Sequence, residues 1–261
     1  MRPLHSRWFE HVFVMLTDAS RRHLDTPGAS LDSPSLGCLL VSYSARPVDR
    51  AAVPAVAVSA LPALLAAVAG RRRTAWSLLT LPLGVTAFFR DPDRTPDHRQ
   101  VDPDLVLAPA DGKVMYVGPG QVGVAPPGSW QQVSIFLSLF DVHINRSPYR
   151  GRVEEVTYRP GKWHAAYRFE SATENERSEI TLVDTVRGEV RRVVFRQIVG
   201  LVARRVVTRV RTGDGVDTGQ RIGLMKFGSR MDVFVPAHVE LVALEGDRVS
   251  AGETLIARWP S

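Results

Sequence analysis

Cysteine and lysine are scarce in this 261-residue chain, which limits its cross-links and metal sites and the source of its positive charge. Cys38 is the single cysteine, so an internal disulfide and a cysteine-based metal site within one chain are both excluded. Lys113, Lys162 and Lys226 are the lysines, so most of the 33 basic side chains are arginine. Against 27 acidic side chains they leave a net charge of +6, which favours anionic partners. Because these arginines are not interleaved with aromatic residues, we expect no nucleic-acid partner.

Charge is absent from the tract between Val53 and Gly70, which three arginines follow, and a second apolar run then extends from Trp76 to Phe89. These runs predict two short helices that form a hydrophobic membrane anchor over residues 51–90. Pro54, Pro62, Pro82 and Gly84 interrupt them. A helical hairpin, a re-entrant pair and an interfacial anchor therefore all stay open, with two buried core helices as the alternative. Residues 1–50 show no sustained period and predict a poorly ordered leader.

Long amphipathic helices are missing after residue 97, where valine-rich segments alternate with glycine and proline. Phe88 to Pro96 is predicted to be a linker, because it is rich in proline and aspartate. We expect residues 97–261 to form a barrel-like β sandwich, which makes the chain mainly β (α+β). The predicted strands are Gly112–Val117, Gln132–Leu139, Arg152–Tyr158, Glu179–Thr185, Glu189–Ile198, Leu201–Val210, Arg221–Phe227, Met231–Val235 and His238–Leu244.

Gly228 and Ser229 interrupt two strand-like segments, where glycine normally weakens pairing unless a bend requires it. A strained bend suits self-cleavage: glycine has no Cβ to block attack on its carbonyl, and a neighbouring serine hydroxyl can add to it. The dipeptide alone is not specific, since Gly128 and Ser129 repeat it. An ordinary turn is the alternative.

Polar residues also gather where a predicted strand ends, at Asp141, His143, Asn145 and Arg146. His143 could act as a general acid or base near neutral pH, or it could be a hydrogen-bonded structural residue. Asp111 follows a proline in a predicted turn, where it could simply cap backbone amides.

A long polar stretch from Pro160 to Leu182 contains several further candidates. They are Lys162, His164, Glu174, Asn175, Glu176 and Arg177. A loop of this length inside a β domain is more often a functional lid or substrate loop than a plain solvated loop.

Taken in order, these segments resemble the phosphatidylserine decarboxylase family, in its short bacterial and archaeal form. The matching motifs are FFRDP at Phe88–Pro92, PADG at Pro109–Gly112, FDVHINR at Phe140–Arg146, ENER at Glu174–Arg177 and KFGSRMD at Lys226–Asp232. The resemblance implies a membrane enzyme, on the cytoplasmic face of a bacterial cell membrane, that converts phosphatidylserine to phosphatidylethanolamine and carbon dioxide.

The resemblance also implies that the chain cleaves itself between Gly228 and Ser229, and that Ser229 becomes a covalent pyruvoyl group that forms a Schiff base with the substrate. The products would be a β chain, residues 1–228, and an α chain, residues 229–261, that stay together as a heterodimer. Association of this heterodimer into a homo-oligomer stays open. No metal is expected. His143 falls on the family's catalytic histidine, and Asp111 falls on the aspartate that supports the base.

The remaining site candidates are substrate-binding or supporting residues, namely Asn145, Arg146, His164, Glu174, Asn175 and Lys226. Arg146 departs from the family's long form, which has a second histidine at that place and uses it to activate the serine. The base that activates Ser229 therefore stays open between His143, Asp111, His164 and His238.

One rival from another class is a biotinyl or lipoyl carrier modified at Lys226. The segment from Val242 to Ala257 has the Gly-Asp-x-Val-x-x-Gly-Glu pattern of those small barrels, and Lys226 precedes it at a plausible spacing. A zinc peptidase is disfavoured because the chain has no His-x-His pair.

Overall fold

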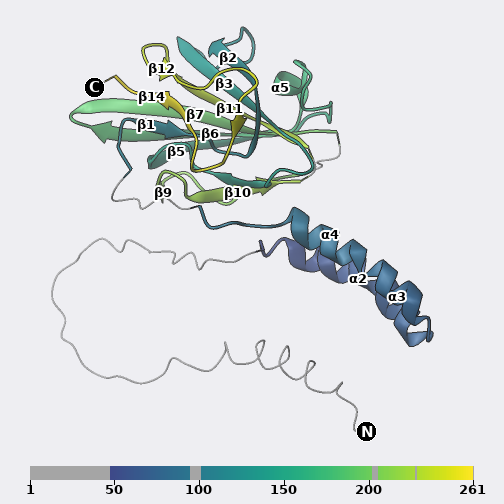
Figure 1. Cartoon of the computed structure of the whole chain (residues 1–261). Coiled ribbons are helices and arrows are strands. Elements are labelled where there is room, and N and C mark those ends of the chain that lie inside the picture. Colours follow the sequence, from purple (N-terminus) through teal and green to yellow (C-terminus); the bar gives the residue numbers. More distant parts are fainter. Residues whose placement is uncertain (1–47, 95–100, 202–204, 227, 261) are drawn as a thin grey trace, which may run out of the picture. The chain divides into compact units, whose positions relative to one another are not determined.

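The computed structural model describes residues 48–94, 101–201, 205–226 and 228–260. The predicted leader therefore lies almost entirely outside the described residues. Strands predominate, and the largest sheet is curled like half of a barrel (Figure 1). The mainly β prediction is confirmed at this level.

The helices occupy the apolar region predicted to be helical, together with one short helix in the β region. Their bounds are Ala52–Val68 (α2), Arg72–Leu78 (α3), Thr80–Phe88 (α4) and Ser171–Glu174 (α5). The second apolar run is thus two helices and not one, because the helix is interrupted at Leu79. Helix α2 packs against both α3 and α4. Within the described residues, no helix is long and apolar enough to cross a membrane.

Eight strands form the largest sheet, in the order β13-β2-β3-β11-β7-β6-β5-β9, and every paired neighbour is antiparallel. Their bounds are β2 Gly112–Pro119, β3 Trp130–Leu137, β5 Gly151–Arg159, β6 Arg177–Val186, β7 Glu189–Val199, β9 Gly215–Val216, β11 Ser229–Pro236 and β13 Arg248–Val249. An antiparallel sheet joined by short turns is the arrangement expected when alternating helices are missing.

Two smaller antiparallel sheets complete the β region, ordered β1-β14-β12 and β4-β10-β8. Their strands are β1 Leu105–Leu107, β4 Ile144–Arg146, β8 Val206–Thr208, β10 Arg221–Met225, β12 Glu240–Leu241 and β14 Leu255–Arg258. The strands predicted over Leu201–Val210 and His238–Leu244 are therefore much shorter than expected. Strand β3 also ends two residues early, because Ser138 donates through both its backbone N–H and its hydroxyl to Asp141 and closes a turn.

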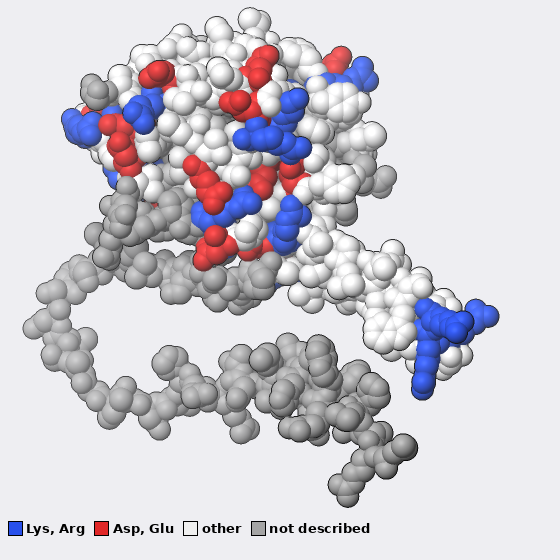
Figure 2. Space-filling model, viewed as in Figure 1, with Lys and Arg blue, Asp and Glu red and all other residues white. Residues whose placement is uncertain are grey.

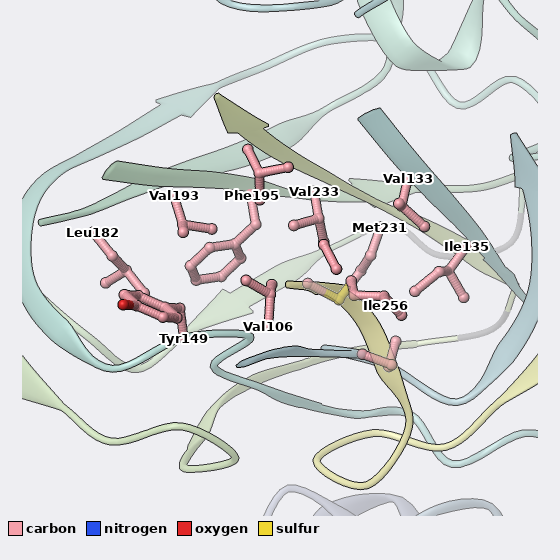
Figure 3. Close-up of a cluster of buried hydrophobic side chains, with 14 of the residues drawn as sticks. Val106, Val133, Ile135, Tyr149, Leu182, Val193, Phe195, Met231, Val233 and Ile256 are labelled. Carbon is pink, nitrogen blue, oxygen red and sulfur yellow. The ribbon is translucent and has the colours of Figure 1, made fainter. Parts of the chain in front are cut away.

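The main core lies on one face of the curled sheet, where Met231 and Val233 of β11 meet Ile135, Phe195 and Ile256 (Figure 3). Strand β11 is also buried on its other face, where Phe234 joins a second apolar cluster. Side chains alternate along a strand, so Ser229 lies on the same face as Met231 and Val233. The start of β11 is therefore in the interior of the protein.

The segment predicted to be a linker is packed against the β region over its described part. Phe89 and Asp91 are buried, and the carboxylate of Asp91 pairs with Arg221 at 2.8 Å and with Arg146 at 3.7 Å. The segment connects the helices to the β region, and an ion pair of this kind fixes it to the strands that follow.

Candidate active site

Ser229 opens strand β11 and lies between two strands, paired with Leu137 of β3 and Val199 of β7. It is fully buried, and its hydroxyl oxygen has no hydrogen-bond partner within the described part of the chain. Leaving a buried hydroxyl unpaired costs about 1–3 kcal/mol, so such an atom points to a functional position. Gly228 precedes it with a φ of 62°, in the left-handed region that glycine adopts without strain.

The second Gly-Ser pair shows what is particular about this position. Gly128 also has a positive φ, of 118°, but Ser129 is exposed in the turn before β3. The alternative reading of Gly-Ser as an ordinary turn therefore describes Gly128 and Ser129. At Ser229 the same dipeptide delivers a hydroxyl into the interior of the sheet.

Backbone pairing brings the segment that contains His143 against the segment that leads to Ser229. The backbone N–H of Met225 donates to the carbonyl oxygen of His143 at 3.2 Å, and the next residue, Ile144, pairs with Leu224. Met225 is four residues before Ser229, while Leu137, the partner of Ser229, is six residues before His143. Both ends of the segment 137–144 therefore lie against the segment 224–229.

The His143 ring is held in a neutral form. It is buried, and this burial lowers its pKa from 6.5 to about 4, outweighing the opposite effects of Asp141 and Asp111. Its Nδ1 lies 2.8 Å from the carbonyl oxygen of Asp141, which can only accept, so Nδ1 carries the hydrogen. Nε2 then carries the lone pair, and no partner for it occurs among the described residues. A neutral imidazole with a free acceptor nitrogen is suited to take up a proton.

Asp111 is anchored from two sides. One carboxylate oxygen accepts from Arg94 at 2.5 Å and from the backbone N–H of Ala251 at 2.8 Å. Asp111 is also near enough to His143 to raise its pKa. Its carboxylate caps a backbone amide, as the turn prediction says, and it acts electrostatically on the histidine.

Arg146 and Asn145, which follow His143 in the chain, differ in their hydrogen bonding. The guanidinium of Arg146 is buried and donates to the carbonyl oxygens of Gly219 and Pro92, both at 2.9 Å. It is fully protonated at neutral pH and cannot serve as a base. Asn145 accepts from the Gln197 side chain at 2.8 Å, while its own Nδ2 has no partner in the described part of the chain.

The long polar loop carries two kinds of residue. Glu174 binds Lys162 at 2.9 Å and the His164 ring at 3.0 Å, and the hydrogen bond from Lys162 lowers the pKa of Glu174 ahead of that from His164. Asn175 is instead fully buried, and its Nδ2 donates to the carbonyl oxygens of His164 and Val199, each at 2.8 Å. Since Val199 pairs with Ser229, the loop reaches the site through Asn175 and is not simply solvated.

The last two predicted candidates, His238 and Lys226, differ in their distance from this arrangement. His238 lies 3.8 Å from Glu189, at the start of β7, whereas Ser229 pairs with the last residue of that strand. Eleven residues at a strand's rise separate the two ends by about 33 Å, so His238 is too far away to be the base. The ammonium of Lys226 lies 5.7 Å from the centre of the Phe89 ring.

The sequence did not single out three residues that contribute here. Phe88, predicted as part of the apolar run, the linker and the FFRDP motif but not as a site residue, lies with its ring 4.1 Å from that of His143. Gln197 holds Asn145, and Gly200 lies beside Gly228. Only the FFRDP motif could have pointed to the first of these. The described residues include no group of three or more potential metal ligands.

The structure combines a mainly β fold with a buried serine after a left-handed glycine, and the comparisons identify the family. The family model for phosphatidylserine decarboxylase matches residues 82–257. A phosphatidylserine decarboxylase proenzyme of Solibacter usitatus is 44% identical over 209 residues, which cover 78% of this chain and 92% of the relative. The proenzyme of Salinibacter ruber is also 44% identical, covering 70% and 81%, and that of Symbiobacterium thermophilum is 48% identical, covering 70% and 82%.

This chain belongs to the phosphatidylserine decarboxylase family. The predicted resemblance and the prediction of an enzyme are thereby confirmed. The carrier alternative at Lys226 loses its support, because the matched region includes both Lys226 and the barrel-like pattern behind it within a decarboxylase family.

Proposed function

We propose that this protein is a self-processing, pyruvoyl-dependent decarboxylase that converts phosphatidylserine to phosphatidylethanolamine and carbon dioxide. The observation that carries the proposal is the buried Ser229 hydroxyl, unpaired among the described residues, directly after the left-handed Gly228. The relatives named as proenzymes support a chain that is made in a precursor form.

Self-cleavage follows from the chemistry of these groups. Nε2 of His143 takes the Ser229 hydroxyl proton as the oxygen adds to the Gly228 carbonyl carbon, and the amide becomes an ester with a free amine at residue 229. Removal of the Ser229 Cα proton then expels the Gly228 carboxylate and leaves dehydroalanine. Water replaces the nitrogen, which leaves as ammonia, and a pyruvoyl group remains at the start of the α chain.

His143 is the best candidate for the base on this structure. Arg146 cannot accept a proton, His238 lies at the other end of β7, and the ring of His164 is hydrogen-bonded to Glu174. Asp111 is engaged by Arg94 and Ala251 and acts on His143 from nearby. Its role is to favour the protonated imidazole that forms when His143 accepts the serine proton.

The residues around Ser229 fit a pyruvoyl group, because the position is enclosed by two strands and has a buried oxygen without a partner among the described residues. The group supplies a carbonyl that binds the substrate amine and accepts the electrons released as carbon dioxide leaves. In this proposal His143 would return a proton to the product. The Nδ2 of Asn145 is a donor available to a substrate oxygen.

The substrate is an anionic phospholipid, so we also propose that the enzyme works at a membrane, on the cytoplasmic face of a bacterial cell membrane. Large apolar side chains of the helices are exposed, including Leu64, Leu65 and Trp76. In Figure 2 the helical segment is free of charge except for a basic cluster where α2 meets α3, and the three residues Arg71, Arg72 and Arg73 are exposed there. Apolar side chains bordered by arginine suit an anionic lipid surface.

The test is an activity assay with phosphatidylserine in mixed micelles, scored by the phosphatidylethanolamine formed. The wild-type protein is expected to be active. Ser229→Ala is expected to be inactive, and Ser129→Ala, in the exposed second Gly-Ser pair, is expected to keep full activity. Activity in Ser229→Ala would refute the proposal.

A further inference from the structure

The end of strand β7 lies directly against the bond that is proposed to break. Val199, its last residue, pairs with Ser229, and Gly200 follows. A Cβ built on Gly200 would lie 2.1 Å from the carbonyl oxygen of Gly228 and 3.1 Å from its carbonyl carbon. Both are backbone atoms, so no flexible side chain could move aside to make room.

Conformation does not explain why this residue is glycine. Gly200 is not among the described glycines with positive φ, so alanine could adopt its backbone angles. The reason is space, since the Gly228 carbonyl occupies the position that any side chain would take. Placement of that carbonyl therefore depends on residue 200 being glycine.

A second contact fixes the same strand end. The Asn175 side chain accepts from the backbone N–H of His164 and donates to the carbonyl oxygens of His164 and Val199, all at 2.8 Å. Because it is fully buried and uses both of its amide ends, Asn175 holds the polar loop and β7 in one geometry. A Cβ on Gly200 would also lie 3.2 Å from Ala166, a further residue of this loop.

We propose that Gly200 and Asn175 are positioning residues for self-cleavage, which set the Gly228 carbonyl where the Ser229 hydroxyl can attack it. The inference rests on the proposed self-cleavage. It assigns the polar loop a task in processing the precursor, before any substrate binds. Neither residue exchanges a proton or touches the hydroxyl; they act through the position of the carbonyl.

The test compares cleavage rates of folded precursors on denaturing gels. A displacement of about 1 Å costs on the order of 100-fold in such a reaction, so Gly200→Ala is expected to slow cleavage at least that much. Gly151→Ala is the matched control. Its Cβ would lie 2.6 Å from the carbonyl oxygen of Val183, in the part of the sheet remote from Ser229, and its φ of 144° adds strain. This control is expected to cleave at the wild-type rate.

Hydroxylamine separates a positioning role from a later defect. It attacks an ester between Gly228 and the Ser229 oxygen, forming a hydroxamate on Gly228 and freeing a chain that begins with serine. If Gly200→Ala prevents attack on the carbonyl, no ester forms and hydroxylamine releases no chain. Release of a serine-initiated chain from Gly200→Ala would place its defect after the attack and overturn the inference.

Asn175→Ser provides an independent variant if Gly200→Ala does not fold. The shorter side chain cannot span His164 and Val199, so slow cleavage and no release by hydroxylamine are again expected. Cleavage of either folded variant at the wild-type rate would overturn the inference while leaving the proposed function intact. A wild-type protein that stays uncleaved would refute the proposed function itself.

Discussion

The neutral, buried His143 should make this protein unusually sensitive to mild acid. Its pKa is lowered to about 4 by burial, whereas the unfolded chain titrates at the ordinary 6.5. Between these values the unfolded state binds a proton that the folded state does not. Stability is therefore complete above pH 6.5 and falls as the pH decreases toward 4.

The size of this effect follows from the shift. Each pKa unit corresponds to about 1.4 kcal/mol, so His143 alone should remove about 2 kcal/mol from the free energy of unfolding between pH 7 and pH 5, and about 3 kcal/mol by pH 4. The side chain is 2% exposed, so solvent screening reduces the figure little. For a small domain such a loss is a substantial part of the total stability.

The assay uses urea unfolding of Ser229→Ala, which is expected to stay one chain and so to refold after unfolding. Its partner is the double variant Ser229→Ala/His143→Gln, whose amide has no charge at either pH. The double variant should lose about 2 kcal/mol less between pH 7 and pH 5. Equal losses in the two proteins would show that burial does not lower the pKa of His143 and would refute this account of its protonation.

The remaining predictions concern the same site and its surroundings. Asp91→Asn should lower the free energy of unfolding by about 3–5 kcal/mol in urea titrations, because it removes the buried carboxylate that pairs with the buried Arg221 guanidinium at 2.8 Å; a loss below 1 kcal/mol would contradict this. Leu65→Glu should reduce sedimentation with anionic vesicles, while Val190→Glu, at a similarly exposed residue of β7, should not; equal sedimentation would count against the membrane role of the helices. The rate of self-cleavage should fall on the acid side with an apparent pKa near 4, and a midpoint near 6.5 would contradict the lowered pKa of His143.

The strands were predictable where the chain alternates valine with polar residues over a long stretch. Strands β5, β6 and β7 begin and end within about two residues of their predicted bounds. Strand β11 begins at Ser229, two residues earlier than expected, and β8 and β12 are short. Such boundaries depend on strand partners far away in the chain, which a local pattern does not contain.

The sequence predicted the reacting groups of the site but not the residues that position them. Gly228, Ser229 and His143 stood out through composition, order and family resemblance. The role of Asn175 depends on its bond to Val199, 24 residues away, and that of Gly200 on its approach to Gly228. The lowered pKa of His143 results from its burial, and Asp91 pairs with Arg221, which is distant in the sequence. Neither property can be read from the neighbouring residues in the chain.

The most direct measurement of the central claim is the intact mass of the purified wild-type protein. We predict two chains divided after Gly228, with the bond between Gly128 and Ser129 intact. Together they should weigh the precursor plus one water minus one ammonia, and the smaller chain should start with a ketone that reacts with hydrazine reagents. A single chain that is nevertheless active, or a small chain that starts with a free serine amine, would contradict the account.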